Sequence, residues 1–67
     1  MKKQEIGENA GIIWQYLDTN GGCPTKELNK HLKMNEKEFY MALGWLAREN
    51  KIAFYEKEEI EYVYLYY

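Results

Sequence analysis

The sequence predicts an α+β fold, because three segments with apolar residues at helical spacing precede two segments with the alternating pattern of strands. A short turn separates the second helix from the third, and the strands follow the third helix directly. This order, a three-helix core followed by a two-stranded β-hairpin wing, is that of a winged helix-turn-helix domain. We expect helices over about residues 7–19, 25–33 and 36–49, and strands over about residues 52–56 and 61–66.

The first helix is predicted from one apolar face and a glycine stop. After Asn20, the pair Gly21 and Gly22 tolerates the positive φ that ends a helix. Cys23 precedes Pro24 and is expected to be extended, because a residue before proline avoids the helical region. Four residues at steps of four, three and four define the apolar face: Ile6, Ala10, Ile13 and Leu17.

The second and third helices each have a predicted start. Thr25 is expected to cap the second helix through its side-chain oxygen, with Glu27 in the first turn. Asn35 is expected to cap the third helix, with Glu38 three residues later in the position of a capping box. The residues expected to face the core are Leu28, Leu32, Phe39, Leu43 and Leu46.

The period of the apolar residues changes to two after the third helix. Ile52 and Phe54 lie on one face of the expected strand, and Ala53 and Tyr55 lie on the other. Residues 56–59 form a polar turn, and the segment after it is dense in β-branched and aromatic residues. The two strands are therefore expected to pair as a hairpin.

Composition restricts the classes of function. With 67 residues, 46% of them apolar, we expect one compact domain over residues 1–67. Cys23 and His31 are single residues of their types, so neither an intrachain disulfide nor an ordinary zinc site can form. The nucleophiles, histidine and carboxylates show no catalytic spacing, so we expect no enzyme, no cofactor and no small-molecule substrate. No apolar run reaches membrane-spanning length and the first residues are not signal-like, so we expect a cytoplasmic protein without membrane contact.

Two stretches of the sequence carry a likeness to known proteins. One is residues 6–17, IGENAGIIWQYL, and the other combines residues 37–40, KEFY, with residues 42–52, ALGWLARENKI. They resemble a family of small stand-alone bacterial winged-helix proteins of unknown function. The likeness covers nearly the whole chain, and residues 43–49, LGWLARE, are its most specific part. The resemblance implies the fold, a homodimer and a DNA-binding ancestry related to transcription regulation, and it implies no particular ligand.

A row of lysines is the first candidate DNA contact. Lys26, Lys30 and Lys33 share the outer face of the second helix, and Lys37 opens the third. In a helix-turn-helix motif the first of the two helices, here the second helix of the chain, crosses the phosphate backbone. This row can therefore neutralise phosphates, with Arg48 as a further contact. The alternative is a solvated helix face that keeps the protein soluble.

The outer face of the third helix and the wing carry few groups that read bases. Met41, Gly44 and Trp45 form a partly apolar patch that suits a protein contact, although Trp45 folding back on the hairpin as part of the core is an equal alternative. Residues 56–61 contain four glutamates and one lysine, and the net charge of the chain is −2. We therefore do not expect the wing to approach DNA phosphates.

The last strand and the first helix carry more apolar surface than one copy needs. One face of the strand bears three tyrosines and the other bears Val63, Leu65 and Tyr67, whereas a wing over three helices needs one covered face. The first helix likewise has apolar residues outside its core face. We expect a two-fold homodimer, and the alternative is tyrosines lying flat on a monomer. The predicted interface residues are Ile12, Tyr16, Tyr62, Tyr64 and Tyr66.

The sequence thus leaves two functions open. The first is a dimeric, regulator-like winged-helix module that binds duplex DNA through the lysine row. The second is a protein-protein interaction module that keeps the fold and does not bind DNA.

Overall fold

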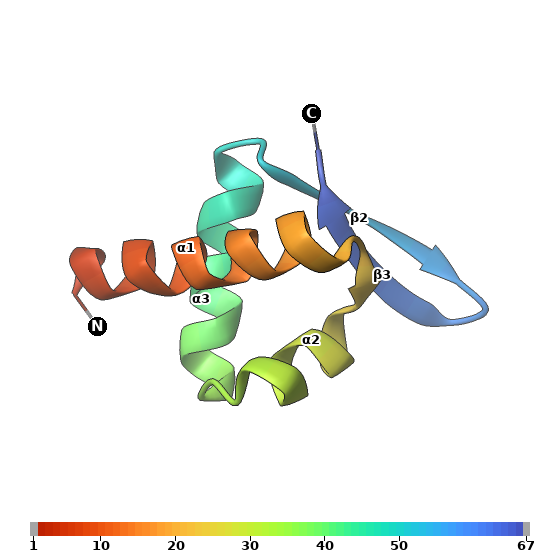
Figure 1. The fold of residues 1–67 in the computed structure, drawn as a ribbon, viewed down its shortest axis with the longest axis horizontal. Coiled ribbons are helices and arrows are strands. Elements are labelled where there is room, and N and C mark those ends of the chain that lie inside the picture. Colours follow the sequence, from red (N-terminus) through yellow and green to blue (C-terminus); the bar gives the residue numbers. More distant parts are fainter. Residues whose placement is uncertain (1, 67) are drawn as a thin grey trace.

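The computed structural model describes residues 2–66 and contains three helices and a three-stranded antiparallel sheet in this range. Helix α1 crosses α3 near the middle of α3, α2 lies beside the start of α3, and the sheet stands to one side of the helices (Figure 1). The predicted α+β winged-helix fold is confirmed. The elements are α1 (Lys3–Asn20), β1 (Cys23–Pro24), α2 (Thr25–Leu32), α3 (Glu36–Arg48), β2 (Ile52–Lys57) and β3 (Ile60–Leu65).

Two of the predicted helix boundaries follow from local hydrogen bonds. Gly21 ends α1 with φ 82°, and its backbone N–H donates to the Leu17 carbonyl at 2.8 Å. At the start of α3, the Asn35 side-chain oxygen accepts from the backbone N–H groups of Lys37 at 2.9 Å and Glu38 at 3.4 Å. These bonds satisfy backbone groups that a helix end otherwise leaves without a partner.

Two other boundaries differ from the prediction. Helix α1 begins at Lys3 rather than near residue 7, because its first residues are good helix formers whose polarity hides them from a search for apolar spacing. The predicted cap at Thr25 is wrong, since Pro24 holds the cap position and Thr25 is the first helical residue. The Thr25 hydroxyl is buried and makes no hydrogen bond to another described residue. Proline suits the position before the helix because its φ is fixed and it has no N–H to satisfy.

The sheet has one strand more than the predicted two-stranded wing. Strand β3 lies in the centre and pairs with both β1 and β2, with Cys23 opposite Val63 and Phe54 also opposite Val63. Gly22 makes the approach of β1 possible, because a Cβ at this position would lie 3.0 Å from the Tyr64 Cβ and 3.1 Å from the Val63 carbonyl oxygen. The extended dipeptide predicted at Cys23–Pro24 is therefore also an edge strand, where a proline is tolerated.

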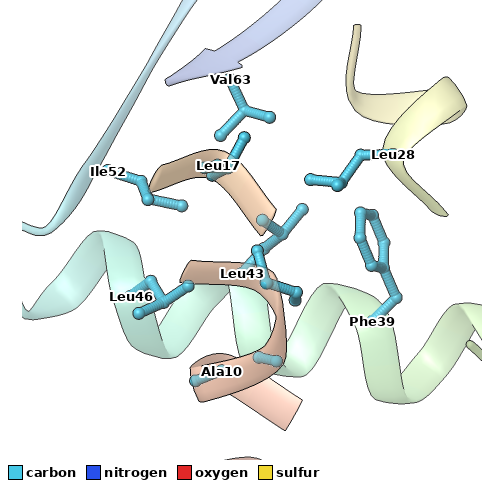
Figure 2. Packing of buried hydrophobic residues seen from close by; sticks show 10 residues of the cluster. Ala10, Leu17, Leu28, Phe39, Leu43, Leu46, Ile52 and Val63 are labelled. Carbon is cyan, nitrogen blue, oxygen red and sulfur yellow. The ribbon is translucent and has the colours of Figure 1, made fainter. Parts of the chain in front are cut away.

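The core lies between α1, α2, α3 and the inner face of the sheet. In Figure 2, Leu17, Leu28, Leu43 and Val63 point toward a common centre, with Phe39 closing one side. Ile13, Phe39, Ala42 and Val63 are fully buried. The apolar faces predicted for the three helices are thus the faces that pack, and Val63 is the residue through which β3 joins them.

The hairpin turn of the wing has an unusual backbone. Glu58 and Glu59 connect β2 to β3, and both have positive φ, 52° and 66°. Positive φ at both central residues is the signature of the hairpin turn that normally contains Asn-Gly, because it matches the twist of the strands. Two glutamates in this conformation are strained.

Candidate functional site

The predicted lysine row is exposed and lies along α2 and the start of α3. Lys26 and Lys30 are on α2, and Lys37 is in the first turn of α3. Lys33 departs from the prediction, because it is not on the face of α2 but follows its last residue with φ 55° in the left-handed region. We define the lysine row as these four residues.

The exposed face of α3 mixes charge with apolar groups. Lys37 and Arg48 stand near its two ends, and Tyr40, Met41 and Gly44 lie between them, with Tyr40 43% exposed. A helix that reads bases in the major groove normally carries side chains that can donate and accept hydrogen bonds here. In the middle of this face Met41 and Gly44 are apolar, as predicted, and the hydroxyl of Tyr40 is the group there that can donate or accept.

Trp45 does not belong to this exposed patch. It is half-buried and packs against the core, and the Lys3 ammonium lies 5.9 Å from the centre of its ring. Trp45 follows Gly44 by one residue, about 100° around the helix, which turns it toward α1. Trp45 is therefore packed, but beside α1, whereas the sequence alternative had it packing on the hairpin.

The wing is acidic at its tip. Glu56 and Glu61 are direct cross-strand partners, and Glu58 and Glu59 form the turn between their strands. Like charges placed directly opposite each other on two strands are destabilising. A cavity of about 330 Å³ separates this end of the wing from Lys26 and Tyr40. The charge that the wing presents next to α3 is thus the same sign as DNA phosphate.

Tyrosines gather on the outer face of the sheet. The rings of Tyr55 and Tyr62 stack with centroids 4.9 Å apart and planes 5° from parallel, and Tyr64 lies 5.7 Å from Tyr55. Tyr55 is 49% exposed and Tyr66, just beyond β3, is 57% exposed. Tyr67 lies outside the described residues. We call the following set the tyrosine face: Tyr55, Ile60, Tyr62, Tyr64 and Tyr66.

Tyr55 was missing from the predicted interface. The pairing of Glu56 with Glu61 places Tyr55 opposite Tyr62, and this pairing could have been found from the predicted strand ends. Ile12 and Tyr16 were predicted in the same interface but have other neighbours. Ile12 is exposed on α1, whereas the half-buried Tyr16 contacts His31 of α2 with ring centroids 4.9 Å apart.

A groove of about 400 Å³ lies where α1 meets the end of α3 and the start of β2. The groove was not predicted, because its residues come from two stretches, 7–14 and 45–51, that lie far apart along the chain. Ala10 and Leu46, labelled in Figure 2, lie at the crossing of the two helices. The lining residues are Gly7, Ala10, Gly11, Trp14, Trp45, Leu46, Glu49 and Lys51.

The single cysteine is poorly suited to nucleophilic chemistry. Burial raises the pKa of the Cys23 thiol, and the nearby Glu27 carboxylate raises it further. A thiol that stays protonated is a weak nucleophile. Among residues 2–66, no three or more His, Cys, Asp or Glu side chains are grouped to hold a metal ion. No helix in the same range is long and apolar enough to cross a membrane.

The element order, the helix pair α2–α3 and the hairpin packed beside them define a winged helix-turn-helix protein. The chain belongs to the family described as Winged helix-turn-helix domain (DUF2582), which matches residues 1–65.

Two relatives illustrate the family. The chain is 46% identical over 54 residues to the uncharacterized protein MJ1608 of Methanocaldococcus jannaschii, with 72% of this chain and 71% of the relative covered. The solution NMR structure of protein BT2368 from Bacteroides thetaiotaomicron is similar with a TM-score of 0.84 and 34% identity, covering 97% of this chain and 79% of that chain. The first relative is archaeal, so the likeness is not restricted to the bacterial proteins that the sequence resembled.

Proposed function

We propose that this protein is a homodimeric winged-helix module that acts by binding another protein and has no catalytic activity. The observation that carries the proposal is the character of the two surfaces that a winged helix normally presents to DNA. Between its charged ends, the exposed face of α3 carries the aromatic ring of Tyr40 and the thioether of Met41, and the wing beside it carries four glutamates. Carboxylates at the wing repel phosphates, whereas exposed aromatic and thioether groups are common in protein contacts.

The dimer is proposed to form through the tyrosine face. Tyr55 and Tyr66 are exposed, and the stacked Tyr55–Tyr62 pair presents a flat aromatic surface beside the half-buried Tyr64. Tyrosine suits an interface, because the ring buries apolar area while the hydroxyl stays hydrated at the edge. Ile12 is a second exposed apolar residue that the partner copy can cover.

DNA binding is a second candidate function, and the lysine row supports it. All four lysines are exposed: Lys26 and Lys30 lie on α2, the helix of the motif that would cross the phosphate backbone, Lys33 follows its last residue, and Lys37 lies at the start of α3. Arg48 is exposed at the far end of α3. In this alternative the protein is a cytoplasmic, regulator-like DNA-binding dimer that contacts phosphates more than bases.

Binding of a fluorescent duplex as a function of salt separates the two functions. The interaction module is expected to show no binding at about 50 mM salt, whereas four or five phosphate contacts give a log-log slope of about −3.5 to −4.5. If the wild type binds DNA with such a slope and the double variant Lys30→Glu, Lys33→Glu does not bind, the DNA function is established and our first proposal is refuted. The matched control is Lys2→Glu, Lys57→Glu, which changes the net charge equally at exposed residues outside the lysine row.

A further inference from the structure

The groove between α1 and α3 contains features that packing within the chain does not explain. Gly7 and Gly11 lie one turn apart in the interior of α1, and a Cβ at either position would meet no atom within 4 Å. Glycine inside a helix destabilises it by about 0.5–1 kcal/mol relative to alanine. Gly22 has a steric reason in the fold, whereas Gly7 and Gly11 have none and both line the groove.

The walls of the groove are aromatic. Trp14 and Trp45 are the two tryptophans of the chain, both are half-buried, and both line the groove. Indole faces stack well on flat rings, and a groove of about 400 Å³ is within the size range of small-molecule sites. The missing side chains at Gly7 and Gly11 leave room for a flat group beside the indoles.

The charges around the groove favour an anion. Lys51 lines it, Lys3 lies over the Trp45 ring, and Glu49 is the one carboxylate among the lining residues. The Lys51 backbone is fixed, because its N–H donates to the Leu46 carbonyl at 3.0 Å and its carbonyl accepts from the Tyr66 N–H at 2.9 Å. Lys51 and Glu49 balance each other among the lining residues, and the Lys3 ammonium beside the Trp45 ring adds a positive charge next to the groove, on a chain with net charge −2.

We infer that this groove is a binding site for a small planar aromatic anion, such as an aromatic carboxylate, held between Trp14 and Trp45 with its charge toward Lys51. None of its lining residues belongs to the tyrosine face or the lysine row, so the inference does not depend on the proposed function. It concerns a bound ligand, and no reaction of that ligand is implied.

Three probes with one ring system and different charges test the inference: 2-naphthoate, 2-naphthalenemethanol and 2-naphthylmethylammonium. The indole N–H signals of Trp14 and Trp45 in ¹H–¹⁵N NMR spectra of the protein both report on this groove. We expect 2-naphthoate to shift both signals saturably and to bind about tenfold or more tightly than the ammonium probe, which corresponds to about 1.4 kcal/mol. Lys51→Glu is expected to reverse that preference.

A filled groove provides the decisive control. Gly11→Leu places a side chain in the groove and introduces a better helix former, so the variant is expected to fold at least as stably as the wild type and to lose 2-naphthoate binding. Gly44→Leu makes the same change at an exposed glycine of α3 outside the groove and is expected to bind normally. The inference is overturned if neither indole signal shifts saturably, if the three probes bind equally, or if Gly11→Leu binds like the wild type.

Discussion

The turn of the wing offers a stability prediction that can be worked out from its backbone. The left-handed conformation costs a residue with a Cβ about 1–2 kcal/mol, and both Glu58 and Glu59 adopt it. In the double variant Glu58→Asn, Glu59→Gly, asparagine tolerates the left-handed conformation and glycine adopts it without a Cβ. Glycine loses more conformational freedom on folding, and this lowers the gain in stability by about 0.5–1 kcal/mol. We expect a net gain in the free energy of unfolding of about 1–3 kcal/mol. This corresponds to a rise in Tm of about 4–8 °C for each kcal/mol in a domain of this size.

Urea and thermal unfolding followed by circular dichroism measure this gain. The matched control is Glu58→Gln, Glu59→Gln, which removes the same two charges from the acidic wing and keeps the strained backbone. If the control is stabilised as much as the Asn-Gly variant, the repulsion between carboxylates is the cause and the argument from backbone strain is refuted.

Three further predictions concern the helix cap, the edge strand and the thiol. Asn35→Ala removes the acceptor at the start of α3 and is expected to lower the free energy of unfolding by about 1 kcal/mol, whereas Asn35→Asp keeps an acceptor for the bond. If urea titrations show that both variants lose the same stability, the prediction is contradicted. Gly22→Ala should destabilise by about 1–3 kcal/mol, because its Cβ would lie 3.0 Å from an atom of β3, whereas Gly44→Ala should stabilise slightly; a stable Gly22→Ala would contradict the close approach. The raised pKa of Cys23 means that the folded state holds the thiol proton more tightly than the unfolded chain, so its contribution to stability is lost as pH rises above the ordinary thiol pKa. Iodoacetamide should alkylate the folded protein with a pH midpoint above that of a free cysteine, and Glu27→Gln should lower the midpoint; an unshifted midpoint would count against the burial.

Local chemistry made most of the fold predictable. Gly21 and Asn35 act through bonds to residues two to four positions away, so their roles can be inferred without knowing the rest of the structure. The apolar faces of the helices can also be inferred without the rest of the structure, because the spacing of apolar residues along the sequence determines them. Strand β1 was missed as a strand, because two residues have no periodicity and its pairing with Val63 depends on a segment far along the chain.

The surfaces were less predictable than the core. Trp45 lies at the border between the core face and the exposed face of α3, where helical spacing cannot decide its position. Tyr55 joins the tyrosine face only through the register of the hairpin. The groove depends on Gly7 and Lys51, which are far apart in sequence, and such juxtapositions follow from the tertiary structure alone.

The association state of the protein in solution tests the central claim most directly. Sedimentation equilibrium at high micromolar concentration is expected to give twice the mass of the chain for the wild type and for Tyr40→Arg, and the mass of one chain for Tyr55→Arg. Tyr40 and Tyr55 are similarly exposed, 43% and 49%, but only Tyr55 belongs to the tyrosine face. A monomeric wild type, or a Tyr55→Arg variant that remains dimeric, would contradict an interface at the tyrosine face.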